Sequence, residues 1–464
     1  MASSLHEVLA HTSIAVVGGG VTGSSVVRFL QSQGITPVVL DEKLTEVAGV
    51  RASKEISPNL LSEIRLAIVS PGWKSSHPIL TSLRASGIAL IREIVLAWLY
   101  KKERFPDQKW VAITGTNGKT TTTQMVESIF NSSHTPSQGA VCGNVGRTVI
   151  DVLTDGQEYE FLALELSSFQ IEWSNAAHFA ASAILNIADD HVDWHGSFQE
   201  YANAKLKLLT YSDIAILNAE DAEVVVRSAA FSGEKVFYSL ETPAPNEIGL
   251  VEELLVDRHF VSDPNKAESF AELSDIKPTV PHNVSNACAA AGIALALGFS
   301  HQQVQTGLKN FVLDHHRMEL VLDQDGISWV NDSKATNPHA ASASVLSHHN
   351  VVWIAGGLAK GADMDPLIKR ISKRLKHAIL IGSDSSLIEK SLHEYAPHVE
   401  ISHIDKTGSS EDFMDAIVGQ ASKIAESGDV VLLAPACASM DQFISYAQRG
   451  SLFADSVARI VGKK

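Results

Sequence analysis

The sequence predicts an α/β fold built from three doubly wound domains. Short runs of β-branched residues alternate with helix-like segments from one end of the chain to the other, which is typical of parallel sheets with crossover helices. Glycine-rich turns follow two of the apolar runs, at residues 18–23 and 115–118. A length of 464 residues is too great for one ordinary hydrophobic core. We therefore expect domains at residues 1–98, 99–314 and 315–464.

The first domain, residues 1–98, is predicted to be Rossmann-like. Strands are expected at Ile14–Val17, Val38–Leu40 and Leu66–Val69. The turn Gly18-Gly19-Gly20-Val21-Thr22-Gly23 fits the dinucleotide-binding fingerprint, and Asp41 ends the second strand 21 residues after Gly20, where an acid would bind a ribose. Taken alone, this pattern indicates an NAD-dependent dehydrogenase. A plain tight turn with Asp41 as a helix cap is the alternative without a ligand.

The central domain, residues 99–314, is expected to begin after a polar linker, Tyr100–Gln108, which contains Pro106. Its region Pro243–Pro281 has the least regular pattern. Its clearest elements are strands at Trp110–Ile113, Phe161–Leu166 and Ala183–Ile187 and helices at Phe198–Leu209 and Asn283–Leu297.

The third domain, residues 315–464, follows Asp314–Arg317 and is again predicted to be Rossmann-like. Strands are expected near residues 329–330, 351–355, 378–381 and 430–433, alternating with amphipathic segments.

Thr114–Thr123, with the sequence TGTNGKTTTT, is a candidate phosphate-binding loop, which makes the central domain P-loop ATPase-type. Because Gly118-Lys119-Thr120 follows a predicted strand and opens a predicted helix, backbone N–H groups and the Lys119 amine would face a phosphate, and Thr120 would hold a magnesium ion. Position 113 is Ile where the usual pattern has Gly, so the loop is a shortened relative. The alternative is a Gly-Asn turn with an exposed lysine. Four consecutive threonines are poor helix starters, which favours a binding role.

Acidic residues and histidines follow two further strands of the central domain. Glu165 lies at the end of one strand, and Asp189, Asp190, His191, Asp193 and His195 fall within seven residues after the next. Carboxylate and imidazole groups beside a phosphate loop suit magnesium held jointly with phosphate oxygens. A solvated acidic turn is the alternative for the cluster. Lys205, on the following helix, would by itself be an ordinary surface lysine.

Composition restricts the class of protein further. The formal net charge of -16 argues against phosphate-neutralising nucleic-acid binding, although small anions can still be bound locally. Cys142, Cys288 and Cys437 are widely separated and lack metal-ligand spacing, so we expect reduced thiols. The first ten residues do not resemble a signal peptide, and no run approaches membrane-spanning length. We expect a cytoplasmic protein without membrane insertion.

The whole chain resembles the Mur ligase family, whose members join amino acids to a peptidoglycan precursor with ATP. The resemblance rests on Thr114–Thr123, Gly143–Gly146, Leu164–Gln170, His191, Lys205, His282–Asn286 and His316-Arg317. Within the family, Asp332–Asn337 and Pro435–Phe443 are similar to the C-terminal motifs of members that add D-glutamate to UDP-N-acetylmuramoyl-L-alanine. Met318, Ala434 and Tyr446 depart from the family's common Phe, Ser and Phe, and the last leaves contact details open.

The resemblance also implies roles for individual residues. The catalytic residues it implies are Lys119, Glu165, His191, Lys205 and Lys334. The implied metal-binding residues are Thr120, Glu165, His191 and Lys205, the last as a carbamylated lysine. The implied ATP-binding residues are Gly115, Thr116, Asn117, Gly118, Lys119, Thr120, Thr121, Asn283, Asn286, His316, Arg317 and Asp332. The implied UDP-substrate-binding residues are Gly20, Val21, Thr22, Asp41, Ser70, Gly72 and Asn144, and the D-glutamate-binding residues are Thr336, Lys360, Ser439 and Tyr446.

The activity implied by the resemblance is that of an ATP-dependent carboxylate-amine ligase. It would add D-glutamate to UDP-N-acetylmuramoyl-L-alanine through an acyl phosphate, in peptidoglycan synthesis and hence cell wall biogenesis, cell shape and cell division. ATP and two Mg²⁺ ions would be required, and a monomer is expected. The alternatives are a folylpolyglutamate synthase-like ligase, the dehydrogenase indicated by the first domain, and a non-catalytic nucleotide switch.

Overall fold

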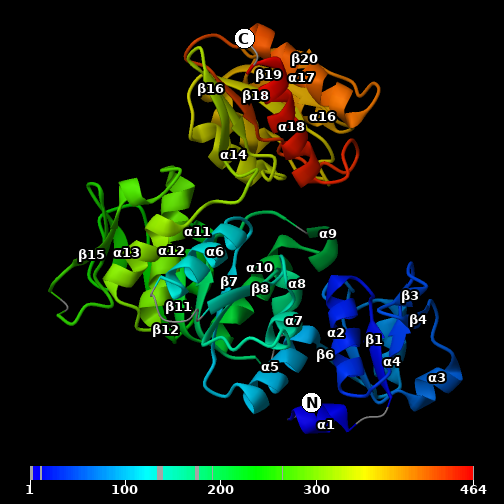
Figure 1. The fold of residues 1–464 in the computed structure, drawn as a ribbon. Helices are drawn as coiled ribbons and strands as arrows, with labels where there is room; N and C mark the ends of the chain where they lie inside the picture. Colours follow the sequence, from blue (N-terminus) through cyan, green and yellow to red (C-terminus); the bar gives the residue numbers. More distant parts are fainter. Residues whose placement is uncertain are drawn as a thin grey trace. The chain divides into compact units, whose positions relative to one another are not determined.

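The computed structural model describes residues 4–10, 13–132, 139–172, 177–190, 192–263 and 265–462. These residues form three β-sheets, which appear in Figure 1 in blue, in cyan to green, and in yellow to red. The chain divides into two compact units. One unit comprises Met1–Thr279 with Asn283–Phe311, and the other comprises Val280–His282 with Val312–Lys464. The first unit therefore contains two of the sheets.

The first sheet has the order β3-β4-β2-β1-β5-β6. Its strands are β1 Ile14–Val17, β2 Val38–Leu40, β3 Glu46–Val47, β4 Val50–Ser53, β5 Leu66–Val69 and β6 Ala89–Arg92. All neighbours are parallel except the β3–β4 pair. Strands β2 to β4 lie on one side of β1, whereas β5 and β6 lie on the other, so the strand order reverses between β1 and β5. Ligands of such sheets bind at the carboxyl ends of the strands at this point.

The second sheet has the order β15-β14-β13-β12-β11-β10-β7-β9-β8. Its parallel strands are β7 Lys109–Thr114, β8 Gly139–Gly143, β9 Phe161–Glu165, β10 Phe179–Ile184, β11 Ser212–Asn218, β12 Glu234–Tyr238 and β13 Glu247–Val251. Two antiparallel strands, β14 Leu254–Asp257 and β15 Glu268–Glu272, extend one edge. β7 lies between β9 and β10, so the turn after β7 is flanked by the ends of both.

The third sheet has the order β16-β17-β21-β18-β19-β20. Its strands are β16 Glu319–Gln324, β17 Ile327–Asn331, β18 Val351–Gly356, β19 Leu375–Ile381, β20 Glu400–His403 and β21 Val430–Leu433. All neighbours are parallel except the β16–β17 hairpin. The three sheets confirm the predicted three-domain α/β fold and add antiparallel edge strands to it.

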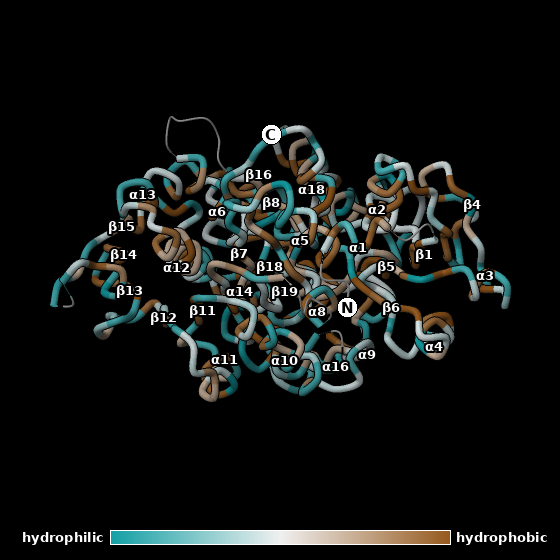
Figure 2. Tube along the Cα trace, turned by 90° about the horizontal axis from the view of Figure 1, so that it is seen from below, coloured by the Kyte–Doolittle hydropathy of each residue, from teal (hydrophilic) through white to brown (hydrophobic). Residues whose placement is uncertain are grey.

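Helices connect the strands in every domain. In the first unit they are α1 Leu5–Leu9, α2 Val21–Ser32, α3 Pro58–Glu63, α4 Pro78–Ala85, α5 Glu93–Arg104, α6 Lys119–Phe130, α7 Val149–Leu153, α8 Ser168–Ile171, α9 Val192–His195, α10 Phe198–Leu206, α11 Ala222–Ser228, α12 Pro281–Ala296 from its third residue on, and α13 His301–Asn310. In the second they are α14 Pro338–Leu346, α15 Asp365–Ile371, α16 Ser385–Tyr395, α17 Ser410–Ile424 and α18 Tyr446–Ile460. Figure 2 shows hydrophobic and hydrophilic residues alternating along the trace, as expected for helices that cover a sheet with one face.

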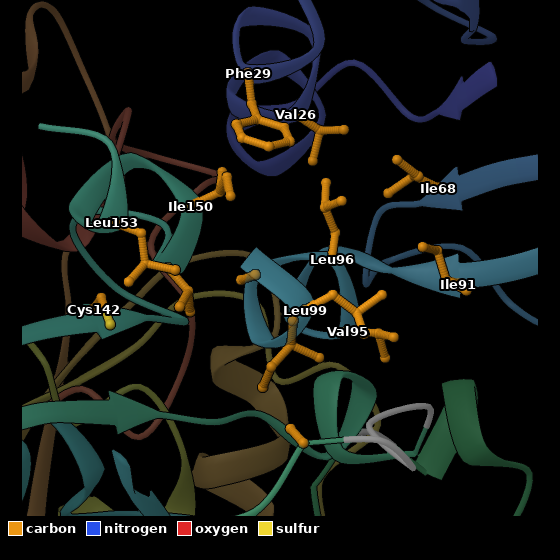
Figure 3. Packing of buried hydrophobic residues seen from close by; sticks show 14 of the residues in the cluster. Val26, Phe29, Ile68, Ile91, Val95, Leu96, Leu99, Cys142, Ile150 and Leu153 are labelled. Atoms are coloured by element: carbon orange, nitrogen blue, oxygen red, sulfur yellow. The ribbon is translucent and has the colours of Figure 1, made fainter. Parts of the chain in front are cut away.

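A continuous hydrophobic core joins the first two sheets within the first unit. Val26 and Phe29 of α2 and Leu96 of α5 pack with Ile150 and Leu153 of α7, which belongs to the central domain (Figure 3). Burial of this apolar surface stabilises the arrangement of the two domains.

Polar contacts reinforce the same junction. Asp151 of α7 accepts hydrogen bonds from Ser25 at 2.5 Å and from Arg28 at 3.0 Å. Glu93, the first residue of α5, accepts a hydrogen bond from the backbone N–H of Ile150 at 2.9 Å. Burial, together with the charge of the neighbouring Asp151, raises the pKa of Glu93 to about 7, although the hydrogen bond from Ile150 opposes this shift. These contacts hold the first domain against the central one.

Three local predictions are wrong. The strand expected at Ala183–Ile187 is β10, which ends at Ile184. Leu185 and Ile187 remain buried beyond the end of the strand, so the apolar run is longer than the strand itself. Asn186, between them, accepts a hydrogen bond from Asn117 of the phosphate loop. The linker expected at Tyr100–Gln108 begins within a helix, because α5 continues to Arg104. Part of the region Pro243–Pro281, which has the least regular sequence pattern, forms β13, β14 and β15.

Candidate active site

The turn between β7 and α6 forms the centre of the candidate site. Gly118 precedes α6 with φ +83°, in the left-handed region that favours glycine. A Cβ atom at Gly118 would lie 2.5 Å from Oδ1 of Asn286, near the start of α12. The helix begins at Lys119, and the N–H groups of a helix's first turn are a common binding position for an anion.

Lys119 folds back over this turn. Its Nζ atom donates to the backbone oxygens of Gly115 at 2.8 Å and Thr116 at 3.0 Å. Asn117 is held by Asn186, which accepts from its N–H at 2.8 Å and donates to its oxygen at 3.1 Å. The Thr120 side chain is half-buried, whereas Thr121 is buried, so contact between Thr121 and a ligand would involve its backbone.

Lys205 lies beneath the same turn and is not a surface residue. Its side chain is 2% exposed, and Nζ donates to the backbone oxygen of Gly115 at 2.9 Å. Burial lowers the pKa of Lys205 well below its ordinary value, and the nearby Lys119 lowers it further. The structure thus corrects the expectation from spacing alone, and burial favours the neutral form of the Lys205 amine.

Tyr201 connects Lys205 to the phosphate loop. Its ring centroid lies 4.7 Å from Nζ of Lys205, and its hydroxyl is 2.9 Å from Oγ1 of Thr116. Burial raises the pKa of Tyr201, so the hydroxyl keeps its proton. Tyr201 was not among the residues predicted from the sequence, although its position four residues before Lys205 puts both on one face of α10.

Glu165 and Asn144 meet at the end of β9. Glu165 is 3% exposed, and its Oε1 accepts a hydrogen bond from Nδ2 of Asn144 at 2.9 Å. The backbone N–H of Asn144 also donates to the backbone oxygen of Glu165 at 2.8 Å. The structure therefore brings a predicted metal-binding residue and a predicted acceptor-binding residue into direct contact.

The residues around the phosphate loop could hold a divalent cation together with phosphate oxygens. Among the described residues no group of three or more His, Cys, Asp or Glu side chains is arranged to hold a metal alone. Glu165 and Thr120 offer oxygen ligands, and His191 lies outside the described residues. An ammonium at Lys205 would repel the ion, whereas a carbamate would supply a further carboxylate-like ligand. The donor set therefore fits Mg²⁺ if Lys205 is carbamylated.

The predicted nucleotide-contacting asparagines lie at the start of α12. Asn283 and Asn286 are buried, and Nδ2 of Asn283 donates to the oxygen of Pro278 at 3.2 Å. Because Asn286 lies close to Gly118, the start of α12 is next to the phosphate loop.

A second candidate crevice lies at the carboxyl ends of β1 and β5 in the first domain. No described atom lies within 4 Å of a Cβ built at Gly20, which precedes α2, so a ligand can approach the backbone there. Val21 is 72% exposed, Thr22 is half-buried, and Gly72 is exposed. Oγ of Ser70 donates to the oxygen of Gly18 at 2.8 Å, which links the two strand ends.

Asp41 holds the shape of this crevice. Its Oδ2 accepts from the N–H of Gly19 at 2.7 Å, and Oδ1 accepts from Lys43 and Leu44, both at 2.8 Å. Although burial by itself would raise the pKa of Asp41, these backbone donors lower it below its ordinary value. The Asp41 carboxylate therefore stabilises the glycine-rich turn through Gly19, whether or not it also contacts a ribose.

In the second unit, the predicted residues gather at the carboxyl ends of β17, β18 and β21, which are neighbours in the sheet. Asp332 and Lys334 follow β17, Lys360 follows β18, and Ser439 follows β21. A bridge between Leu358 and Ala438 joins the last two loops. The exposed Lys360 has φ +52°, and Ser439 is buried.

Lys334 and Tyr446 are in direct contact. Nζ of Lys334 lies 3.8 Å from the centroid of the Tyr446 ring, a cation–π arrangement. Oγ of Ser333 donates to the backbone oxygen of Tyr446 at 2.8 Å, and the N–H of Thr336 donates to the oxygen of Lys334 at 2.8 Å. The start of α18 is thereby tied to the loop after β17.

His316 and Asp332 are fixed near the same loop. His316 has φ +67°, and its Nδ1 is 2.9 Å from Nδ2 of Asn331. Asp332 accepts from the N–H of Met318 at 3.3 Å and from the Ser344 hydroxyl. Burial raises the pKa of Asp332 to about 6, partly offset by these hydrogen bonds and by the charge of Arg317.

Family models match three consecutive parts of the chain. They are described as "Mur ligase MurD-like, N-terminal domain" for residues 12–92, "Mur ligase middle domain" for residues 113–294, and "Mur ligase, glutamate ligase domain" for residues 316–437.

Similar proteins extend over nearly the full length. A protein of Streptomyces coelicolor is 41% identical over 96% of this chain and 98% of its own length, and one of Thermobifida fusca is 41% identical over 97% and 98%. Both are named UDP-N-acetylmuramoylalanine--D-glutamate ligase. Among solved structures, a pseudomurein peptide ligase type C from Methanothermus fervidus matches with a TM-score of 0.59 at 18% identity, covering 97% of this chain and 99% of that one. This last likeness supports the fold alone.

Proposed function

This chain belongs to the Mur ligase family, and we propose that it adds D-glutamate to UDP-N-acetylmuramoyl-L-alanine with conversion of ATP to ADP and inorganic phosphate. The observation that carries the proposal is the 41% identity over nearly the whole chain to ligases named for D-glutamate. The arrangement of Lys119, Glu165 and Lys205 around one phosphate loop gives it a chemical basis.

ATP would bind between the phosphate loop and the start of α12. Gly115–Thr121 would contact the phosphates, and Asn283 and Asn286 would line the nucleotide site. His316, Arg317 and Asp332 would contribute from the third domain. The N–H groups at the start of α6 and the Lys119 amine suit the negative charge of a triphosphate.

The other two substrates would occupy the carboxyl ends of the remaining sheets. The crevice beside Gly20, Ser70 and Gly72 would take the uridine nucleotide, with Val21, Thr22 and Asp41 nearby, and Asn144 would face the acceptor. D-glutamate would contact Thr336, Lys360, Ser439 and Tyr446, because its two carboxylates need a cation and hydroxyl donors.

Two Mg²⁺ ions are proposed as cofactors. Thr120 and Glu165 would hold one with the triphosphate, and His191 with a carbamylated Lys205 would serve the other. When bound, the ions neutralise charge on the phosphoryl group being transferred. The lowered pKa of Lys205 supports this modification, because only a neutral amine reacts with carbon dioxide.

The reaction would proceed in two steps. An oxygen of the terminal L-alanine carboxylate attacks the γ-phosphorus of ATP, the bond to ADP breaks, and an acyl phosphate forms. The neutral amine of D-glutamate then attacks the acyl carbon and loses a proton, and inorganic phosphate leaves. Lys119 and Lys334 would offset negative charge during phosphoryl transfer, so positioning and electrostatics account for most of the catalysis.

The alternative functions have weaker support. A folylpolyglutamate synthase-like ligase would share the acyl phosphate chemistry, but the first domain matches the MurD-like model. A dehydrogenase would explain the glycine-rich turn but neither Lys205 nor the phosphate loop. A non-catalytic nucleotide switch would leave unexplained the likeness to ligases along the whole chain.

We propose a cytoplasmic monomer. The three cysteines are free and buried, which is compatible with a reducing compartment. No helix in the part of the chain that the structure describes is long and apolar enough to cross a membrane.

An assay of ADP release tests the choice of amino acid. With UDP-N-acetylmuramoyl-L-alanine as acceptor, D-glutamate is expected to stimulate ADP release at least tenfold over L-glutamate or L-lysine, because a site built to bind two carboxylates in one arrangement rejects substrates that leave its polar groups unpaired. A folate acceptor with L-glutamate serves as the control for the alternative ligase. Equal stimulation by all amino acids would exclude the D-glutamate assignment.

A further inference from the structure

Trp194 joins the central domain to the first domain beside both candidate crevices. It lies in the short helix α9, next to the acidic cluster, and its Nε1–H donates to the backbone oxygen of Gly72 at 3.2 Å. Gly72 belongs to the loop after β5 that lines the proposed uridine nucleotide crevice. This hydrogen bond therefore reaches from the catalytic side of the central domain to the substrate loop of the first.

The Trp194 ring is held in place by two aromatic neighbours. Its centroid lies 4.6 Å from that of Phe169 and 4.6 Å from that of His195. Phe169 and His195 stack on each other at 5.4 Å, and Nε2 of His195 is 2.9 Å from Oγ of Ser168. Ser168 and Phe169 begin α8, immediately after the strand that carries Glu165.

These contacts continue to the phosphate loop. His195 packs edge-on against Tyr201 with ring centroids 5.5 Å apart. The Tyr201 hydroxyl contacts Oγ1 of Thr116, which also accepts a hydrogen bond from the N–H of Ala188 at 2.9 Å. An unbroken series of side-chain contacts thus connects Gly72 with the phosphate loop.

The first domain holds the same loop from its other side. Arg92 is 1% exposed and donates to the backbone oxygens of Val69 at 3.1 Å, of Trp73 at 3.2 Å and of Ser70. The oxygen of Gly72, between Ser70 and Trp73, is bonded to Trp194 instead. The position of the loop is therefore shared between a buried arginine of its own domain and a tryptophan of the central domain.

We propose that Trp194 is a positioning residue for the nucleotide-sugar substrate. By fixing Gly72, it sets the distance between the uridine nucleotide crevice and the phosphate loop, so that the acceptor carboxylate reaches the γ-phosphate. The inference rests on the proposed function only in assigning the uridine nucleotide to the crevice beside Gly72. Trp194 does not touch the reacting atoms in this account.

Binding measurements on two variants test the proposal. Trp194→Phe keeps an aromatic ring but removes the N–H donor, and Trp194→Leu removes both. We expect the dissociation constant for uridine diphosphate to rise about fivefold in the first and about twentyfold in the second, from the loss of one hydrogen bond and of the ring contacts. The dissociation constant for ATP with magnesium should stay within about twofold of the wild-type value, since loss of this hydrogen bond leaves the phosphate loop intact.

Trp110→Phe is the matched control. The Trp110 indole N–H donates to the Gln108 side chain at 2.8 Å inside the core, at the end of β7 opposite the phosphate loop. This control should leave uridine diphosphate binding unchanged even if it lowers the melting temperature. Hydrogen exchange at the Trp73 amide should be faster in Trp194→Phe than in the wild type, which identifies the loop as the part released.

The outcomes separate this proposal from the proposed function. Wild-type affinity for uridine diphosphate in both Trp194 variants would overturn the positioning role, as would an equal loss of ATP affinity. A wild-type protein that binds no uridine diphosphate would overturn both the crevice assignment and the role of Trp194. Selective loss of uridine diphosphate binding would support the positioning role whichever amino acid the enzyme adds.

Discussion

Replacing Lys119 by alanine is expected to lower the rate of ATP-dependent amide formation about a thousandfold. The Lys119 ammonium lies against the backbone oxygens of Gly115 and Thr116, at the mouth of the proposed phosphate site. Without it, charge developing on the γ-phosphoryl group would lack its nearest side-chain cation. Initial rates of ADP release with all substrates at saturating concentration measure the effect.

A surface lysine supplies the control for this experiment. Lys109 is exposed at the other end of β7, so Lys109→Ala should keep the wild-type rate. Both variants should melt close to the wild-type temperature, because the phosphate loop is also held by Asn186 and Tyr201. Unchanged turnover in a folded Lys119→Ala protein would refute the phosphate-loop assignment.

Activity is also expected to depend on carbon dioxide through Lys205. The neutral amine that burial favours would react with carbon dioxide to give a carbamate and a proton. When carbon dioxide is removed at mildly acidic pH, the carbamate should be protonated and lost as carbon dioxide, and activity should fall. Adding bicarbonate should restore the activity. A carbamate carbon signal from ¹³C-labelled carbon dioxide should appear in the wild type and be absent in Lys205→Met.

The Lys205→Met variant should lose about 100-fold in rate, the typical effect of removing a group that supports a bound metal. Lys207→Met is the matched control two residues along the chain, because Lys207 is half-exposed and paired with Glu172 at 2.6 Å. Full activity of Lys205→Met, or activity indifferent to carbon dioxide, would contradict the proposed modification.

Strand positions were largely predictable because buried parallel strands are continuous apolar runs. The predicted strands Ile14–Val17, Val38–Leu40 and Leu66–Val69 coincide with β1, β2 and β5. The limit of this signal is seen at Ala183–Ile187, where burial continues beyond the end of β10. The strands β13–β15, toward one edge of the second sheet, had no comparable pattern, because exposed positions interrupt their apolar runs.

The environment of single side chains was harder to predict. Nothing in the spacing of Lys205 indicates that its amine is buried under the Gly115 backbone, because that contact joins residues 90 positions apart. Asp41 matched the position of a ribose-binding acid, yet its oxygens also accept three backbone N–H groups. The contacts of Lys205 with Gly115 and of Asp41 with Gly19 join turns far apart in the sequence, which periodicity does not encode.

The contact between Trp194 and Gly72 illustrates the same limit. The acidic cluster around residue 190 indicated possible metal ligands, whereas the neighbouring Trp194 belongs to no sequence motif that would indicate a function. The hydrogen bond joins residues 122 positions apart, and the packing of α2 and α5 against α7 holds the two domains together.

Isotope transfer tests the central claim, that this chain activates a carboxylate as an acyl phosphate, most directly. UDP-N-acetylmuramoyl-L-alanine would be prepared with ¹⁸O in its terminal carboxylate and incubated with ATP, magnesium and D-glutamate. Each inorganic phosphate released with the amide should carry one ¹⁸O atom, because the bridging oxygen of the acyl phosphate comes from the carboxylate. Phosphate free of ¹⁸O, released as the amide accumulates, would contradict it.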